Sequence, residues 1–518
     1  MELRLRRNTF NQLLMIDGSN QFVMVMVIIG LALVSGLLIG KIGILAVPVL
    51  VGGLLVPVLA LRIGYKFFAY ALFAILTGYQ FGGKGFAYLG YNPIFISELV
   101  LLLGILTVIL MPFSSKIKLA NRKLSWVFIP MFMWMAWSAF RTAPYVAQYQ
   151  LDAIRDAMLY IYALYAFLIL ILIPREMVEH FVNLYGRILP IFVFCGPLIF
   201  IITKFHIMPR MPGSPVPLIF QKSGDMGVHL GGAAAFMLLR LDKFDRPYRQ
   251  NLLWMMWLVW SIAWLTFGSI NRGGLVSASA AIGVAMLLRP NGGWYRPLTL
   301  GVVVICFMLV TGTYSTLRIN LGGNREISAE QIVNNFASVI GSGNDEAGNL
   351  ENTKEWRITW WNKIIDYTFF GDYFWTGKGY GVNLVISDGA YSEANAEAKG
   401  TRSPHNGFMT ILARSGVPGL MLWLVFLAAF LGTLLWNAVP IKKYNLSSEQ
   451  MRLSKIAAWL LAYACAHLMN ANVDVFLEGP MGGIWFWSLV GMSLVIFVAR
   501  PKANDDQANQ ALHYPNAI

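Results

Sequence analysis

Residues 403–419 read SPHNGFMTILARSGVPG and mark the point where a long polar segment gives way to an apolar helix. Pro404 fixes φ just before His405, and Asn406 and Gly407 are poor residues for a helix interior. The sequence therefore predicts that a helix begins here. An imidazole exchanges a proton near neutral pH, so His405 is a candidate base. The alternative is a polar interfacial residue without a chemical role.

The composition indicates an integral membrane protein. Of the 518 residues, 57% are hydrophobic and only 13% are charged, whereas a soluble domain carries about 25% charged residues. The three cysteines, Cys195, Cys306 and Cys465, all lie inside apolar runs. Neither a disulfide framework nor a cysteine-rich metal site is therefore indicated.

The apolar runs predict an all-α polytopic membrane protein with about 14 transmembrane helices, since a run of about 17–25 residues crosses a bilayer. The expected spans are residues 22–40, 42–61, 65–80, 92–111, 125–141, 157–173, 187–203, 226–240, 252–268, 273–288, 297–315, 407–437, 453–470 and 481–499. The chain then divides into helices 1–11 within residues 1–315, a large and partly helical outer loop at 316–406, helices 12–14 within 407–500, and a cytoplasmic tail at 501–518.

The basic residues predict the orientation of these spans. With the N-terminus inside, the cytoplasmic segments hold 23 of the 40 Lys and Arg residues, the long loop holds seven, and all other segments hold ten. This bias follows the positive-inside rule. The net charge of +14 thus reflects topology rather than a nucleic-acid surface. The same topology places Arg272, Arg357 and His405 on the outer face.

Two arginines on that face are candidates for binding an anion. Arg272 lies between two apolar runs and is followed by two glycines. A fork-shaped cation beside the N–H groups of a helix start makes a good pyrophosphate seat. Arg357 and Trp361 are four residues apart and share one face of an expected amphipathic helix at 354–370. The alternatives are a topology-setting arginine at 272 and a snorkelling arginine at 357.

Three motifs, in this order along the chain, resemble the bacterial O-antigen ligase and polysaccharide polymerase superfamily. Residues 269–274 (SINRGG) resemble its Ser-Arg-Gly segment, and residues 357–381 resemble its Arg-x3-Leu/Trp segment and glycine-rich turn. Residues 405–419 carry the pattern His-Asn, nine residues, Gly, two residues, Gly. The resemblance covers roughly residues 265–420; outside it the chain is similar only as a many-helix membrane protein.

The resemblance implies glycan transfer on the periplasmic face of the bacterial inner membrane. The donor would be a glycan on undecaprenyl pyrophosphate, and the acceptor a hydroxyl of another glycan. His405 would be the catalytic base, and Arg272 and Arg357 would bind and stabilise the leaving pyrophosphate. No DxD-like motif stands out in the outer loops, so we expect a metal-independent reaction without a cofactor, in which arginines do the work of a metal.

Further residues on the outer face are candidates for binding substrate or orienting the base: Asn406, Arg402, Arg210, Asp474 and Glu478. The expected partners are the two glycan substrates, the lipid bilayer and a chain-length regulator, with no nucleic acid. More spans are expected than is typical of the ligases, which favours an O-antigen, capsule or exopolysaccharide polymerase over a ligase acting on lipid A-core. A flippase for the same lipid-linked glycan is a third alternative, but it predicts an internal repeat, and none is clear.

Overall fold

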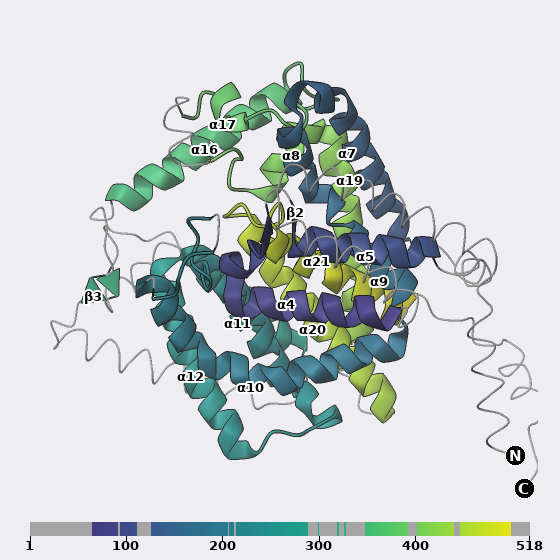
Figure 1. Ribbon diagram of the computed structural model, residues 1–518, viewed down its shortest axis with the longest axis vertical. Coiled ribbons are helices and arrows are strands. Elements are labelled where there is room, and N and C mark those ends of the chain that lie inside the picture. Colours follow the sequence, from purple (N-terminus) through teal and green to yellow (C-terminus); the bar gives the residue numbers. More distant parts are fainter. Residues whose placement is uncertain are drawn as a thin grey trace, which may run out of the picture.

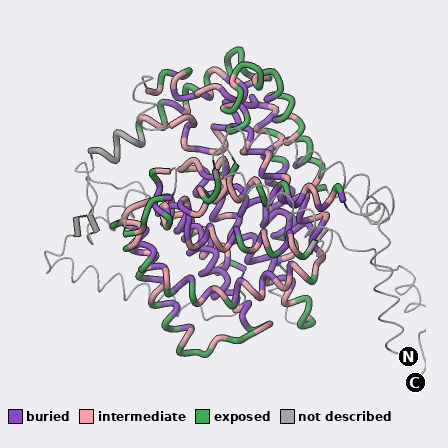
Figure 2. Tube along the Cα trace, viewed as in Figure 1, coloured by how far each residue is buried: buried purple, intermediate pink, exposed green. Residues whose placement is uncertain are grey.

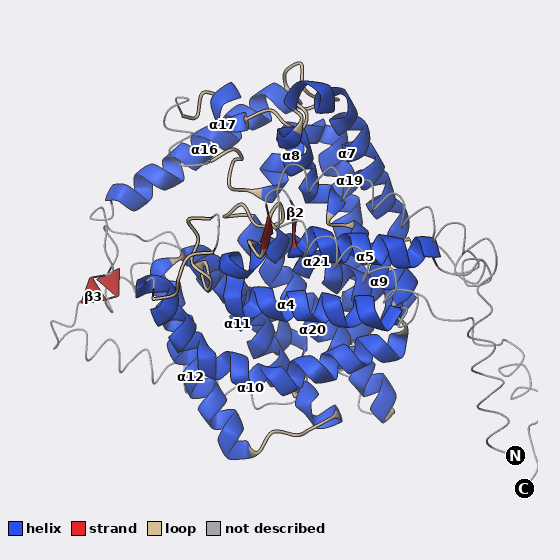
Figure 3. Ribbon diagram, in the orientation of Figure 1, coloured by secondary structure: helices blue, strands red, loops and turns tan. Residues whose placement is uncertain are grey.

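Helices carry nearly all of the regular structure in the computed structural model, and the few strands are short (Figure 1, Figure 3). The structure describes residues 65–91, 94–110, 126–205, 207–211, 214–288, 299, 319–320, 326–327, 348–391, 401–439 and 446–498. The fold is all-α, as predicted.

The elements follow one another along the chain with these bounds: α4 (Tyr65–Ala87), β1 (Gly90–Tyr91), β2 (Ile94–Phe95), α5 (Ile96–Leu110), α7 (Phe128–Tyr149), α8 (Leu151–Ile161), α9 (Leu164–Leu172), α10 (Arg175–Phe205), α11 (Ser223–Leu239), η2 (Leu241–Phe244), α12 (Gln250–Ile270), α13 (Arg272–Leu288), β3 (Ile319–Asn320), β4 (Glu326–Ile327), α16 (Gly348–Phe369), α17 (Leu384–Ser387), α19 (Gly407–Ala438), α20 (Ser448–Ala471), α21 (Pro480–Ser493) and the π-helical η5 (Leu494–Val498). Strands β1 and β2 pair antiparallel, as do β3 and β4.

Helices occupy the expected positions wherever the structure describes them. Two expected spans, at 22–40 and 42–61, lie outside the described residues, and only residue 299 of a third, at 297–315, is described. Each of the other eleven coincides with a helix or a consecutive pair of helices. By length and composition, four described helices can cross a bilayer: α10, α12, α19 and α21 with η5. The pair α8 and α9, bent by 46°, makes a fifth candidate. Fourteen spanning helices therefore remain a prediction.

Helices α11, α13 and α20 form the packed centre of the molecule, where buried residues dominate the trace (Figure 2). Every residue of α11 from Gly224 to Leu239 is buried. The backbones of α11 and α13 touch: a Cβ added at Gly227 would lie 2.4 Å from Cα of Gly274, and one at Gly274 would lie 2.6 Å from the Ser223 carbonyl oxygen. This contact brings the starts of α11 and α13 together.

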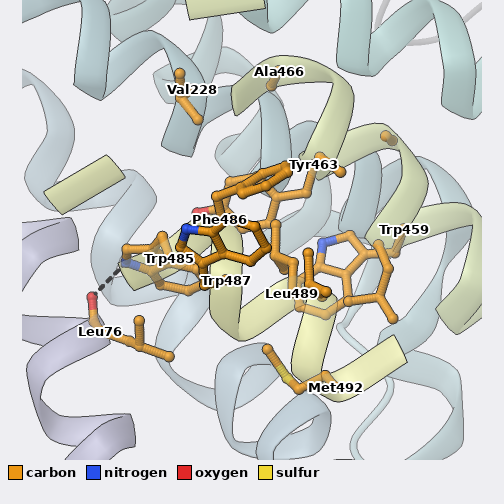
Figure 4. Close-up of a cluster of buried hydrophobic side chains, with 14 of the residues drawn as sticks. Leu76, Val228, Trp459, Tyr463, Ala466, Trp485, Phe486, Trp487, Leu489 and Met492 are labelled. Atoms are coloured by element: carbon orange, nitrogen blue, oxygen red, sulfur yellow. Dashed lines mark hydrogen bonds between the residues drawn. The ribbon is translucent and has the colours of Figure 1, made fainter. Parts of the chain in front are cut away.

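Large aromatic side chains fill the space beside these helices (Figure 4). The Trp485 indole donates to the Leu76 carbonyl at 2.9 Å, which ties α21 to α4. The Trp459 indole donates to the Gly232 carbonyl at 3.1 Å, which ties α20 to α11. A buried indole N–H is costly without a partner and usually has one, so these two bonds help to fix the orientation of Trp485 and Trp459.

Helix α19 is broken at Gly416, where φ is 69°. The break exposes carbonyl groups that the helix would otherwise bond internally. The Ala413 carbonyl accepts from the Lys378 N–H at 2.7 Å, and the Arg414 carbonyl accepts from the Gly379 N–H at 3.1 Å. The glycine-rich turn found in the sequence therefore docks into the kink of α19. Only glycine fits at 416, since a Cβ there would lie 2.5 Å from the Phe374 carbonyl oxygen.

A second hydrophobic cluster holds α16 and α17 over the first half of α19, at the end of the molecule that also carries α8 (Figure 1). Its buried residues are Trp360, Ile364, Leu384, Val385, Leu412, Ala413 and Val417. The expected amphipathic helix at 354–370 is thus confirmed as α16, and its buried face packs on the helix that begins next to His405.

We predict that Gly227→Ala destabilises the protein, because its methyl group would enter the backbone of α13. Overpacking of this kind costs about 1–3 kcal/mol. Gly283→Ala is the matched control: it lies on α13 with no atom within 4 Å of the added Cβ, and alanine favours a helix interior. SDS titration of the purified proteins measures both, and equal stability of the two variants would contradict close α11–α13 packing.

Candidate active site

His405 lies in a strained turn immediately before α19. Its φ is 54°, a left-handed conformation that costs free energy for a non-glycine residue. The side chain of Asn406 accepts hydrogen bonds from the backbone N–H groups of Phe408 and Met409, at 2.9 and 3.2 Å. The predicted helix start is therefore confirmed. Asn406 is its cap, and the cap holds the backbone on which His405 is mounted.

Asp474, in the connection between α20 and α21, orients the imidazole. His405 Nδ1 lies 3.3 Å from Asp474 Oδ1, and the two side chains are 24% and 22% exposed. Burial by itself would raise the pKa of Asp474, but the hydrogen bond from His405 and the charge of Lys222 lower it below its usual value. An ionised carboxylate only accepts hydrogen bonds, so Nδ1 carries the proton. A neutral His405 then presents its lone pair at Nε2.

The same two-residue turn, Val473–Asp474, gathers side chains from three other elements. Arg357 of α16 donates from Nη1 to the Val473 carbonyl at 2.9 Å. The start of α13 packs against it, since a Cβ added at Gly273 would lie 2.6 Å from Val473 Cγ2. Lys222, at the start of α11, places Nζ 3.7 Å from Asp474 Oδ2. The three motif segments thus meet at a turn that none of them contains.

Positive charge exceeds negative charge around this turn. Arg272 is the first residue of α13, and Arg357 and Lys222 reach the turn directly. Burial lowers the pKa of Arg357, and its buried Nε has no hydrogen-bond partner in the described residues. The first turns of α11 and α13 also begin here, and their N–H groups favour an anion. The arrangement fits a ligand that carries several negative charges and lies next to a base.

Arg402 belongs to a buried network rather than to this turn. Asp156 of α8 accepts from the Gly381 N–H at 2.8 Å and lies 2.8 Å from Arg414 Nη1. Arg402 joins it with one nitrogen 3.0 Å from Asp152 and another donating to the Gly381 carbonyl at 2.9 Å. These contacts engage both terminal nitrogens of the Arg402 guanidinium with protein groups. The network clamps the glycine-rich turn and the segment before His405 onto α8.

Glu478, also in the connection between α20 and α21, neighbours Ser403 and Thr410, which lie on either side of His405. Burial raises the pKa of Glu478, although the charge of Arg414 opposes that rise. The connection therefore meets the His405 turn through both Asp474 and Glu478. Arg210, in contrast, is exposed and pairs through its backbone with Pro217; within the described residues no contact joins it to the site.

Reasoning from the sequence did not rank Lys222 above the other outer-face cations and did not single out Asp156 or Arg414. Arg414 carried a usable signal, because a charge inside an apolar helix usually has a buried partner. No sequence signal pointed to Lys222. Its contact with Asp474 exists only because the start of α11 packs beside a turn that lies about 250 residues further along the chain.

These features place a histidine beside a carboxylate and near Arg357 and Lys222, in a protein whose described part has four helices long and apolar enough to cross a membrane. The O-antigen ligase family model matches residues 257–424, a range that includes Arg272, Arg357 and His405. This range also contains all three motif segments that resemble the family. Members of this family are glycosyltransferase-like enzymes of polysaccharide biosynthesis.

Other comparisons add little. No curated protein matches the chain. Among solved structures, a chain from "Structural coordination of polymerization and crosslinking by a peptidoglycan synthase complex" is similar at 16% identity, with a TM-score of 0.36. That match covers 73% of this chain and 98% of the other. At such a TM-score it carries no argument.

We predict that Asp156→Asn destabilises the protein by about 3–5 kcal/mol, because it removes the carboxylate that lies 2.8 Å from the buried Arg414 guanidinium. Asp152→Asn is the matched control. Asp152 is 48% exposed, and losing an exposed ion pair costs at most about 1 kcal/mol. SDS titration measures both variants. Comparable losses would show that the network does not depend on the buried pair.

Proposed function

We propose that this protein transfers a glycan from undecaprenyl pyrophosphate to a hydroxyl group of an acceptor glycan, on the periplasmic face of the bacterial inner membrane, and acts as a polysaccharide polymerase. One observation carries the proposal: His405 and two of its cationic neighbours, Arg357 and Lys222, are held on the single turn Val473–Asp474. An O-antigen ligase would use the same site with lipid A-core as its acceptor, so the acceptor offered in an assay separates the two activities.

The base acts through Nε2 of His405. The acceptor oxygen attacks the anomeric carbon of the donor sugar and gives up its proton to Nε2, while the bond from that carbon to the pyrophosphate oxygen breaks. Asp474, already bonded to Nδ1, stabilises the imidazolium that forms. Undecaprenyl pyrophosphate leaves with the bonding electron pair.

The arginines act on the leaving group. Charge grows on the pyrophosphate oxygens as the glycosidic bond breaks, so preorganised cations stabilise the transition state more than the ground state. Arg357 offers a buried Nε that has no hydrogen-bond partner within the described residues, and Arg272 is the first residue of α13, whose start packs against the same turn. Independence from metal ions stays a prediction and is tested in the assay below.

We predict that His405→Ala lowers transfer by roughly 10²–10⁴-fold while donor binding changes little, because proton removal belongs to the attack step. The measurement is transfer from a synthetic undecaprenyl-pyrophosphate glycan in detergent, with and without EDTA. His180→Ala, on α10 beside Tyr70, is the control and retains activity. Normal transfer by His405→Ala would place the base elsewhere, and loss of transfer with EDTA alone would overturn the metal-independent mechanism.

For Arg272 and Arg357, lysine is expected to be a poor substitute, because a point charge cannot reproduce two parallel hydrogen bonds to phosphate. We predict that Arg272→Lys and Arg357→Lys each lose about 2–4 kcal/mol of transition-state stabilisation, or roughly 30- to 1000-fold in rate. Arg187→Lys, in an exposed pair with Asp245, is the control. Wild-type kcat/KM in both test variants would remove the arginines from the site.

A further inference from the structure

Lys222 stands where a cation is electrostatically unfavourable. It is the N-cap residue of α11 and makes no capping bond, and a positive charge at a helix N-terminus opposes the helix dipole. Its side chain is only 34% exposed. Burial alone would lower the pKa of Lys222, yet the carboxylates of Asp225 and Asp474 raise it. The protein therefore keeps this lysine charged at a position that does not favour charge.

Asp474 lies farther from Lys222 than from its other two partners. Asp474 Oδ1 accepts from the Val475 N–H at 2.8 Å and lies 3.3 Å from His405 Nδ1. The other oxygen, Oδ2, lies 3.7 Å from Lys222 Nζ, which is beyond the range of a good hydrogen bond. One carboxylate thus serves the base through one oxygen and a weakly held cation through the other.

Lys222 is also close to the residues assigned to the pyrophosphate. The starts of α11 and α13 are in contact, since a Cβ added at Gly274 would lie 2.6 Å from the Ser223 carbonyl oxygen. The charged or titratable groups that face this region from the packed elements are Lys84, Tyr88, Asp225, Arg272, Arg357, Tyr391, His405 and Asp474. Lys84 repels Lys222, so an anion among these cations would relieve that repulsion.

We infer that Lys222 exchanges partners during the reaction, from Asp474 to the pyrophosphate of the donor, so that donor binding leaves Asp474 to His405 alone. This inference rests on the proposed function. A carboxylate shared with a lysine stabilises an imidazolium less than one that is not shared. The exchange therefore makes His405 a stronger base when a donor is in place, and it ties activation of the acceptor to the presence of the leaving group.

Binding of undecaprenyl pyrophosphate to the purified protein in detergent tests the exchange. We expect Lys222→Met to weaken binding by about tenfold or more, since it removes one charge-assisted phosphate contact. Asp474→Asn frees the lysine and should tighten binding several-fold. That gain should be largely absent in the double variant. Lys243→Met, an exposed lysine in η2 beyond the other end of α11, is the control and binds normally.

The outcomes separate this inference from the proposed function. If wild-type protein does not bind undecaprenyl pyrophosphate, the proposed function fails. If wild type binds and Lys222→Met binds equally well, only the exchange fails. An equal gain from Asp474→Asn with and without Lys222 would show that Asp474 simply repels phosphate, which also overturns the exchange. Competition by inorganic pyrophosphate reports on the phosphate contacts apart from the lipid.

A pH profile gives a second readout. Before donor binds, Lys222 opposes protonation of His405 by sharing Asp474, so Lys222→Met should move the acid limb of kcat/KM for the donor to higher pH. The acid limb of kcat, which reports the donor complex, should stay in place because Lys222 has already left Asp474 there. Lys222→Arg should restore the kcat/KM limb. An acid limb of kcat/KM that stays at the wild-type pH in Lys222→Met would contradict the exchange.

Discussion

The break in α19 at Gly416 is the constraint on which the site depends. A continuous helix would bond its own carbonyl groups, but here those of Ala413 and Arg414 accept from the glycine-rich turn at 378–379. The Trp137 indole donates to the Ser415 carbonyl at 2.9 Å and so adds α7 to the same junction. The segment that leads from α16 to His405 is therefore anchored to the helix that His405 precedes, and the strained His405 turn is held between fixed points.

Two sets of charges serve different purposes in this structure. The network of Asp156, Arg414 and Arg402 is buried, and its charges are neutralised by one another and by backbone groups. Such networks add little stability over an apolar core, but breaking them is costly, so they fix one arrangement of the loop. The Val473–Asp474 turn instead gathers Arg357 and Lys222 around the carboxylate of Asp474. That excess of positive charge suits a ligand that carries negative charge.

The candidate site residues of the proposed transfer come from four different elements. His405, the candidate base, directly precedes α19, one arginine lies on α16, and another arginine and a lysine lie at the starts of α13 and α11. Packing at the α11–α13 contact fixes the last two relative to each other, because touching backbones leave no room to slide. A rigid cationic seat beside an oriented base is what preorganised catalysis requires.

The sequence by itself determined the features that depend on neighbours along the chain. Apolar runs located the eleven expected spans that the structure describes, and Asn406 and Gly407 located the start of α19. The three motifs lie inside the segment that the family model matches. Whether fourteen helices cross the membrane depends partly on residues 22–61 and 297–315, nearly all of which lie outside the described part of the chain. Only the tertiary structure decided that Asp474 orients His405, that Lys222 shares its carboxylate, and that Arg402 is a clamp. Those pairings join residues about 70 to 250 positions apart. They follow from which helix backbones touch, and periodicity and local propensity carry no information about that.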